Sequence, residues 1–451
     1  MLSVVQLQKE SKQTSDRRSS RSEGALESRV ERERNPIKRF LMLLGPGLIT
    51  GASDDDPSGI GTYTTAGASL GFAMLWTAIL TLPMMAAVQF ICAKIGMVSG
   101  MGLAGALRKH YPSWLVYSAI SLLLIANTIT AGVDIGAIAA AINLLIPIPA
   151  IVLVVPIAVG IVALQIWGSY SIIVRTFKWL TLTLFAYIVA AFLAKPHWGE
   201  VLKATFVPTL RFDNQHMTTL LAILGTTITP YLFFWQASQE VEEELQMGRT
   251  TLAQREGASD KELKIAEIDI DVGMLFASLV FYFVILASAA TLHAAGKTKI
   301  ETAVEAAQAL RPLSSGVASI LFALGLIGSG ALAVPVLTSS SAYAMCEAFK
   351  WKSGLSEKLR GATRFYAIIA VSTLVGAIVN FLKIPPVTAL FWAAVINGIL
   401  APPLLVIIML VSNNREVMGA RVNGLLTNFI GWATVAVMAA ASLGIFLTWG
   451  R

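Results

Sequence analysis

The sequence predicts an all-α integral membrane protein of eleven transmembrane helices, the first and sixth of which are discontinuous. Three observations support this fold class. Of the 451 residues, 55% are hydrophobic and only 14% are charged, whereas a soluble domain carries about a quarter charged residues. Apolar stretches of roughly 20 residues, the length that crosses a bilayer core, recur along the whole chain. Two of these stretches contain a proline beside a run of polar residues.

The apolar stretches and the breakers between them define the predicted spans and their orientation. The spans are 41–70, 72–96, 114–142, 150–167, 172–194, 218–243, 268–293, 316–349, 361–382, 386–411 and 425–449. Lys and Arg gather in the cytoplasmic segments of membrane proteins. With the amino terminus inside, 26 of the 34 Lys and Arg residues lie in inner segments and 8 in outer ones. We therefore expect a multi-pass plasma-membrane protein with a cytoplasmic amino terminus and Arg451 outside the cell.

The segments outside the spans carry little functional signal. Residues 1–38 are polar and charge-dense without an apolar core, which predicts a disordered cytosolic tail rather than a signal peptide. The triplet Glu242-Glu243-Glu244 is expected to form a solvated helix end and loop. Cys92 and Cys346 are too few for a disulfide or metal framework and are expected to be buried thiols. The net charge of +7 follows the membrane topology and does not indicate nucleic-acid binding.

The first and sixth spans do not read as continuous helices. The first contains the run from Ser53 to Gly61 around Pro57, and the sixth contains the run from Gly225 to Tyr231 around Pro230. Each proline frees a backbone carbonyl that lipid cannot satisfy, so the freed backbone must line a cavity enclosed by protein. Breaks five helices apart are typical of two inverted five-helix repeats of the LeuT type, with an ion site near the membrane midplane.

This repeat organisation predicts the domain boundaries. The first repeat covers residues 39–195 and the second covers 196–411, and residues 412–451 supply the accessory eleventh helix. Residues 1–38 are expected to form a separate cytosolic tail before these units.

Three consecutive carboxylates stand at the first break. Acidic residues inside a membrane span are costly and are usually functional. Successive helical residues point about 100° apart, so Asp54, Asp55 and Asp56 cannot all face one pocket. Asp56 lies next to the break and is the best candidate for a cation ligand; capping of the following helix is its structural alternative. Asp54 and Asp55 line the inner vestibule, bond to a neighbouring helix or stay protonated, and Asp55 is retained as a further candidate ligand.

Several motifs in order resemble the natural-resistance-associated macrophage protein (Nramp) family of divalent-metal transporters. The motifs are Gly45-Pro46-Gly47 followed by Asp56-Pro57, the segment QFICAKIGMVSG from Gln89 to Gly100, Ile142-Asn143-Leu144-Leu145, the stretch from Gly328 to Phe349, and Gly431-Trp432. The resemblance covers nearly the whole chain after the tail. It implies a transporter rather than an enzyme, with a divalent cation as substrate and no cofactor.

The departures from the family pattern change the chemistry that the site is expected to have. The family's first-helix Asn is replaced by Gly59, and its Ala-x-x-Met-Pro-His becomes Thr226-x-x-Thr229-Pro230-Tyr231. The third-helix Asp-x-x-Glu, associated with proton transfer, is Ala131-x-x-Asp134, and Gln236 stands at a second histidine position. Carboxylates, hydroxyls and carbonyls without sulfur or imidazole suit Mg²⁺, Ca²⁺ or Mn²⁺.

The pattern is similar to the Nramp-related magnesium transporter branch. This similarity implies Mg²⁺ and Mn²⁺ as substrates, with proton coupling weakened or absent. Because two ligand side chains are shortened, the pocket should be wider and should admit a partly hydrated ion.

The candidate metal-site residues have distinct expected roles. Asp56 would bind the ion directly or through water, Thr226 through its backbone carbonyl, and Thr229 through its hydroxyl or carbonyl. The remaining candidates are Asp55, Gly59 as a residue that provides space, Tyr231 as a cavity wall or a contact of the hydrated ion, and Asn397 as a polar wall. Asp134 has either a residual proton-linked role or an interhelical hydrogen bond. The expected partners are the cation and the lipid bilayer, with no obligate protein partner and no nucleic acid.

Two other functions remain open. A proton-coupled Mn²⁺ or Fe²⁺ symporter would share the architecture, as would a transporter of amino acids or other organic solutes. An organic anion is disfavoured by the three aspartates at the first break. The sequence has no intramembrane His/Asp or Ser/His constellation that would support an enzyme.

Overall fold

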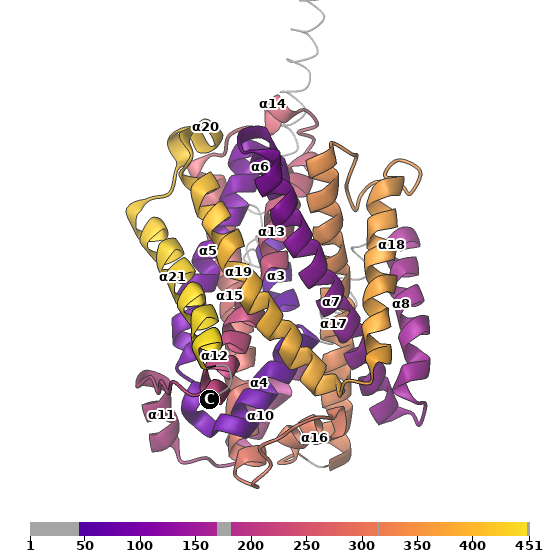
Figure 1. The fold of residues 1–451 in the computed structure, drawn as a ribbon, viewed down its shortest axis with the longest axis vertical. Coiled ribbons are helices and arrows are strands. Elements are labelled where there is room, and N and C mark those ends of the chain that lie inside the picture. The colour runs from indigo at the N-terminus through magenta and orange to yellow at the C-terminus, as the bar shows by residue number, and fades with distance from the viewer. Residues whose placement is uncertain (1–44, 169–181, 314, 449–451) are drawn as a thin grey trace, which may run out of the picture.

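The computed structural model describes residues 45–168, 182–313 and 315–448, and the predicted tail 1–38 lies outside them. The described residues form helices and connecting turns, with no β-strand among them. The helices stand roughly side by side in one bundle (Figure 1). The expectation of an all-α fold is therefore confirmed.

Both predicted breaks are present. The first span consists of α3 (Pro46–Asp54) and α4 (Pro57–Leu70), and the sixth consists of α12 (Asn214–Thr227) and α13 (Pro230–Gln246). In each case the second half-helix begins at the proline that the sequence singled out, because proline is well tolerated in the first turn of a helix, where no N–H is needed.

The unbroken spans and the short helices between them account for the rest of the described chain. The spans are α5 (Thr77–Ser99), α7 (Ser113–Leu145), α8 (Ala150–Trp167), α10 (Ala186–Leu193), α15 (Asp260–Ser288), α17 (Ser315–Phe349), α18 (Thr363–Ala377), α19 (Pro386–Asn413) and α21 (Leu425–Thr448). The short helices are α6 (Leu103–His110), α11 (Trp198–Phe206), α14 (Leu252–Arg255), α16 (Ala303–Ala307) and α20 (Arg415–Met418).

The number of spans agrees with the predicted eleven. In the described part of the chain, nine helical segments are long and apolar enough to cross a membrane, and residues 182–193 form a shorter apolar one. The broken first span adds the eleventh. The beginning of the predicted fifth span, 172–194, falls partly outside the described residues.

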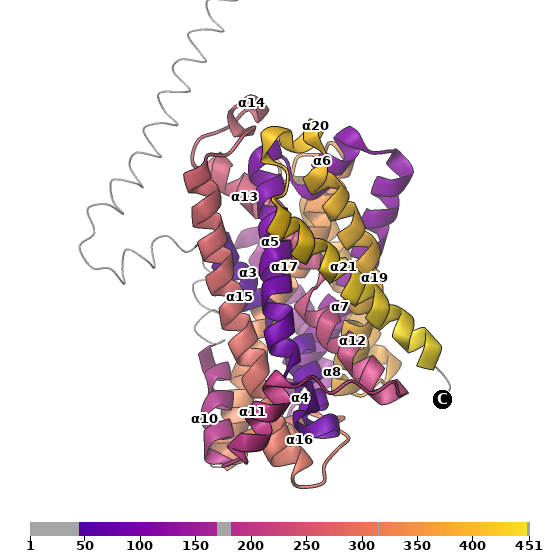
Figure 2. The ribbon, with the colours of Figure 1, turned by 90° about the vertical axis from the view of Figure 1, so that its left-hand side faces the viewer.

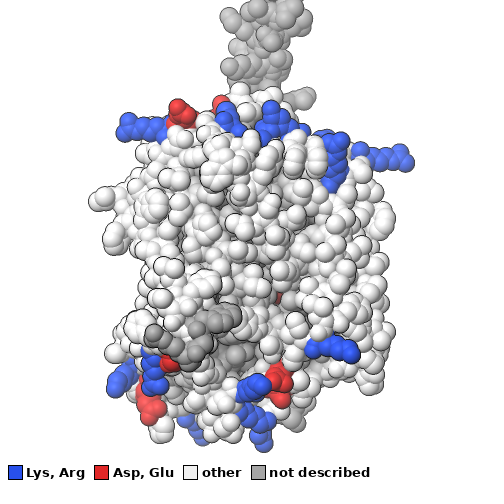
Figure 3. All heavy atoms as spheres, in the orientation of Figure 1, with Lys and Arg blue, Asp and Glu red and all other residues white. Residues whose placement is uncertain are grey.

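The bundle has two polar ends and an apolar middle. Helices α6, α14 and α20 lie at one end, and α11 and α16 lie at the other (Figures 1 and 2). On the face shown in Figure 3, Lys, Arg, Asp and Glu gather at these two ends and leave a broad uncharged belt between them. Such a belt suits the hydrocarbon core of a bilayer. We call the two ends the α14 end and the α16 end.

Glycines allow the half-helices to lie against their neighbours at backbone distance. A Cβ atom at Gly51 in α3 would lie 2.2 Å from the carbonyl oxygen of Gly273 in α15. A Cβ atom at Gly225 in α12 would lie 2.2 Å from the carbonyl oxygen of Ala394 in α19. Small residues at membrane-helix contacts permit this close packing, and here they fix both breaks within the bundle.

Two side-chain expectations outside the site have clear outcomes. Cys92 and Cys346 are buried free thiols, as expected. The expectation that the Glu242–Glu244 triplet is solvated is wrong, because α13 continues through it and Glu242 and Glu244 are only 6% and 4% exposed. The Tyr343 hydroxyl donates to Glu242 at 2.9 Å, and Arg249 pairs with Glu244 at 3.2 Å. Tertiary partners thus bury charges that the sequence pattern places in a loop.

Candidate cation site

The first break is organised by the carboxylate of Asp56. Asp56 is the N-cap of α4, and its Oδ1 accepts hydrogen bonds from the Gly59 amide at 2.7 Å and the Ser58 hydroxyl at 2.6 Å. Its Oδ2 lies 3.4 Å from the Tyr231 hydroxyl. The helix-capping interpretation of Asp56 is therefore correct for Oδ1, while Oδ2 has only the long contact with the Tyr231 hydroxyl. Capping also fixes the orientation of the carboxylate.

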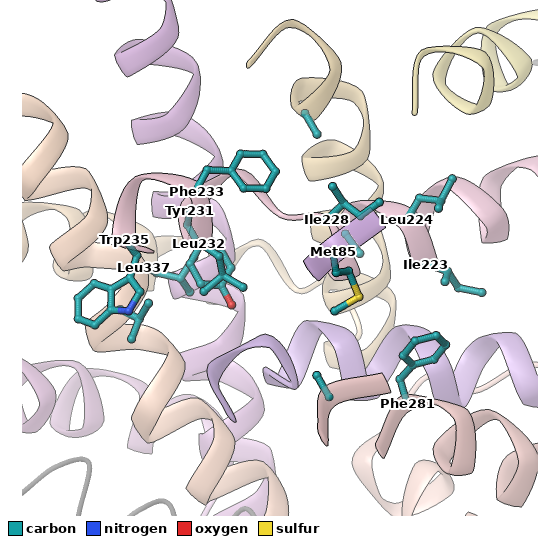
Figure 4. Packing of buried hydrophobic residues seen from close by; sticks show 14 of the residues in the cluster. Met85, Ile223, Leu224, Ile228, Tyr231, Leu232, Phe233, Trp235, Phe281 and Leu337 are labelled. Atoms are coloured by element: carbon teal, nitrogen blue, oxygen red, sulfur yellow. The ribbon is translucent and has the colours of Figure 1, made fainter. Parts of the chain in front are cut away.

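The second break offers neutral oxygens. Thr229 is the N-cap of α13 but makes no side-chain capping bond, and its buried hydroxyl has no hydrogen-bond partner among the described residues. Pro230 has no N–H to donate, so the Thr226 carbonyl loses its normal helical partner. Figure 4 shows the break between Ile228 and Tyr231, with apolar side chains of both half-helices packed around it.

The two breaks meet at Thr226 and the start of α4. The Ser58 and Thr226 hydroxyl oxygens are 3.5 Å apart. A Cβ atom at Gly59 would lie 3.2 Å from the Thr226 hydroxyl, so the glycine permits the close approach of the two broken spans. Asp56, Thr226 and Thr229 are each no more than 2% exposed. The candidate ligands thus gather in one enclosed region of the bundle.

The local electrostatics favour a cation. Helix α3 ends at Asp54 and α12 ends at Thr227, so the carboxyl-terminal ends of both half-helices bring partial negative charge to the gap between the half-helices at the two breaks. All four oxygens of Asp54 and Asp55 are buried and have no hydrogen-bond partner among the described residues. Helices α3, α4, α7, α12 and α13 contain no Lys or Arg. These five helices therefore place buried acidic side chains at the breaks without a basic side chain of their own.

The carboxylates do not converge on one point. In the described residues, no three His, Cys, Asp or Glu side chains form a group that could hold a metal ion. This agrees with the expected fan of Asp54, Asp55 and Asp56 around the helix axis. A cation at the breaks would instead combine one or two carboxylates with hydroxyl, carbonyl and water oxygens.

Asp134 in α7 faces the first break. Its carboxylate is fully buried, interacts electrostatically with Asp56, and lies near the Ser58 amide. Neither oxygen makes a close hydrogen bond to a described residue, and the Ser58 amide of α4 is the backbone donor that interacts with the carboxylate. One turn further along α7, Ile138 lies beside Gly330, where a Cβ atom would also approach Pro57. Asp134 therefore lies on the face of α7 that looks toward the start of α4.

Asn397 and Tyr231 form hydrogen bonds between different pairs of helices. The Asn397 amide donates to the Thr130 hydroxyl at 3.1 Å, four residues before Asp134 on α7. The Tyr231 hydroxyl donates to the Ser53 carbonyl at 2.8 Å. Both side chains are almost fully buried. Asn397 thus joins α19 to α7, and Tyr231 joins the two broken spans.

Sequence reasoning missed the residues that hold α3 in place. Asp269 of α15 accepts hydrogen bonds from the amides of Gly45, Gly47 and Leu48 at 2.9, 2.6 and 3.1 Å. The Thr50 hydroxyl is bonded to the side chain of Gln236, whose amide donates to Glu240 at 2.8 Å. Asp269 could have been recognised as a functional or structural residue, because it is an aspartate inside a predicted apolar span. These bonds fasten the α14 end of the first broken span to α13 and α15.

Comparison with known proteins places the chain in a family. The family described as "Natural resistance-associated macrophage protein-like" matches residues 47–448. The "Divalent metal cation transporter MntH" of Brucella suis biovar 1 is 28% identical over 354 residues, covering 76% of this chain and 74% of that protein. The protein of the same name from Klebsiella pneumoniae is 26% identical and covers 92% of this chain and 96% of the relative.

Solved structures share the fold. A crystal structure of the Eremococcus coleocola manganese transporter superposes with a TM-score of 0.71 at 19% identity, covering 93% of this chain and 90% of that one. The nucleobase-cation-symport-1 family transporter Mhp1 gives a TM-score of 0.53 at 14% identity, covering 90% and 91% of the two chains. MhsT in complex with L-phenylalanine also gives 0.53, at 13% identity and with coverage of 89% and 98%.

Proposed function

The chain belongs to the Nramp family and is a membrane transporter of divalent metal cations, and from this premise we propose that its substrates are partly hydrated Mg²⁺ and Mn²⁺. We further propose that it moves them by alternating access, without tight coupling to protons. The observation that carries the proposal is the enclosed group of oxygen atoms where the two helix breaks meet.

The type of ligand supports hard divalent cations. Asp56 supplies a carboxylate oxygen, Thr226 a carbonyl and Thr229 a hydroxyl that has no partner among the described residues. Sulfur and imidazole ligands, which favour softer transition metals, are absent from the residues at the two breaks, 53–61 and 225–231. Mg²⁺ and Mn²⁺ are well served by oxygen donors, and Mg²⁺ usually retains several waters in proteins.

The charge at the site supports a divalent ion. Asp56, the N-cap residue of α4, and Asp134 of α7 are both buried and interact electrostatically with each other. Two carboxylates balance the charge of one divalent cation, so Asp56 and Asp134 together carry enough negative charge for one such ion. The same pair disfavours an amino acid or other organic anion as the substrate.

The lack of tight proton coupling is proposed from the residues that replace proton carriers. Tyr231 and Gln236 stand where the family has histidines, and both are engaged in hydrogen bonds. Ala131 cannot carry a proton. The alternative, a proton-coupled Mn²⁺ or Fe²⁺ symporter, would rely on Asp134 or on the additional acids Asp54 and Asp55.

Uptake into proteoliposomes tests the proposal. We expect inward flux of Mg²⁺ and Mn²⁺, followed with ion-sensitive dyes, and no acidification of the lumen that tracks the flux. Cd²⁺ uptake without Mg²⁺ uptake would contradict the substrate assignment. Lumenal acidification in proportion to Mn²⁺ flux would contradict the absence of coupling and favour the symporter. Stabilisation of the purified protein by amino acids but not by cations would support an organic substrate.

A further inference from the structure

The Tyr231 hydroxyl forms a hydrogen bond to a backbone carbonyl at the first helix break. Pro57 has no N–H, so the Ser53 carbonyl, four residues earlier, has no helical donor. The Tyr231 hydroxyl donates to this carbonyl at 2.8 Å across a sequence separation of 178 residues. The same hydroxyl lies 3.4 Å from Oδ2 of Asp56. A side chain from the second break therefore caps the carbonyl that the first break frees.

Tyr231 is held firmly in this position. It follows Pro230 in the first turn of α13 and is 1% exposed. The hydroxyl of Ser340 in α17 donates to its backbone carbonyl at 2.7 Å. Figure 4 shows Tyr231 beside its chain neighbours Leu232 and Phe233 at the start of α13. Because the side chain is buried and its backbone is bonded to α17, we expect the capping bond to be a fixed feature of the site.

The bond changes how many protein oxygens a cation can reach. The Ser53 carbonyl and Oδ2 of Asp56 both contact the Tyr231 hydroxyl, at 2.8 and 3.4 Å, so both oxygens border the same hydroxyl group. An ion bound at Oδ2 would have this carbonyl as a neighbouring ligand if the carbonyl were free. With Tyr231 in place, that coordination position falls to water.

We propose that Tyr231 is a specificity-determining residue, which keeps the Ser53 carbonyl out of the ligand set so that the bound ion retains a water molecule. This inference rests on the proposed function. Mg²⁺ gives up its waters reluctantly, whereas Ca²⁺ takes six to eight oxygen ligands in flexible geometry. A site with fewer protein oxygens therefore favours Mg²⁺, and an additional carbonyl would favour Ca²⁺.

The substitution Tyr231→Phe tests the inference, since it removes the hydroxyl and keeps the ring. We expect the ratio of the apparent affinities for Ca²⁺ and Mg²⁺ to rise about tenfold in competition uptake and in ion-dependent thermal stabilisation, because one hydrogen bond of about 1.4 kcal/mol no longer competes for the carbonyl. Tyr187→Phe is the matched control, because Tyr187 is equally buried and its hydroxyl interacts with Thr64 of α4, not with the Ser53 carbonyl. An unchanged ratio in Tyr231→Phe, or an equal loss of affinity for both ions, would overturn the inference.

A second measurement uses the wild-type protein and remains valid if the variant does not fold. Electron–nuclear double resonance of bound Mn²⁺ in ¹⁷O-labelled water reports the water ligands of the ion. We expect water on Mn²⁺ in the wild type and about one water fewer in Tyr231→Phe. Mn²⁺ bound without any water would overturn the inference. Wild-type protein that neither binds nor transports Mg²⁺ would instead refute the proposed function.

Discussion

The two helix breaks differ in how many of their polar atoms already form hydrogen bonds within the protein. At the first break, Asp56 caps α4 with one oxygen and the Ser53 carbonyl is bonded to Tyr231. At the second break, the Thr229 hydroxyl has no partner among the described residues, and Pro230 leaves the Thr226 carbonyl without its helical donor.

Because of this difference, we expect the two breaks to contribute differently to cation binding. The first break supplies fixed negative charge in a preset orientation, and the second supplies neutral oxygens that are free to bind. A cation would thus be attracted by one break and selected by the other. Substitutions at the two breaks should therefore have different effects on affinity and on ion preference.

The largest effect is expected from Asp56. Asp56→Ala should lower uptake of Mg²⁺ and Mn²⁺ by more than about a hundredfold, because the loss of an outer partner of a metal ligand alone costs 10- to 100-fold. Asp56→Asn keeps an oxygen that can cap α4 but removes the charge, and should lower uptake almost as strongly. Dye-based flux measures both. Normal uptake by Asp56→Asn would show that the charge of the first break is dispensable.

Asp134 tests whether the first break depends on a second carboxylate. Asp134→Asn should lower the apparent affinity for both ions by about tenfold, since half of the compensating charge is lost while the ligands of the breaks remain. Titration of thermal stability with Mg²⁺ and Mn²⁺ provides the measurement. If affinity stays the same and only the pH dependence of flux changes, Asp134 has a proton-linked role.

At the second break, Thr229→Met should change the preference between cations more than the overall rate of uptake. A thioether is a softer ligand than a hydroxyl, so the ratio of Cd²⁺ to Mg²⁺ uptake should rise about tenfold, as expected for a change of about 1.4 kcal/mol. Thr227→Val is the matched control, because the Thr227 hydroxyl bonds the Ile223 carbonyl of its own helix at 2.9 Å. An equal shift in both variants would mean that the second break does not select the ion.

The smallest effects are expected at the helix ends far from the gap, and they again differ between the two spans. Asp213 caps α12 locally by accepting from the His216 amide at 2.9 Å, whereas Asp269 caps α3 from another helix through three amides. Asp213→Ala should lower the free energy of unfolding by about 1 kcal/mol, and Asp269→Ala by about 2 kcal/mol because buried donors lose their partner. Unfolding in detergent compares the two. Equal losses would show that α3 does not depend on α15.

Sequence reasoning located both breaks but not the contacts between them. Pro57 and Pro230 mark the breaks because the missing N–H is a covalent property of proline, visible without any tertiary information. The pairing of Tyr231 with Ser53 spans 178 residues, and no local pattern specifies it. Asp134 was recognised as an acid in a membrane span, yet its direction depends on how α7 packs against α4.

The sequence by itself determined the membrane class, the eleven spans, the position of the breaks and the oxygen-only chemistry of the candidate ligands. Each of these follows from composition, hydrophobic length or the covalent structure of single residues. Only the tertiary structure decided which oxygens of Asp56, Ser53 and Thr229 are already bonded and which remain free. Hydrogen-bond partners depend on the packing of helices that are distant in the chain. At Gly51 and Gly225 the helix backbones lie so close together that a side chain would not fit between them.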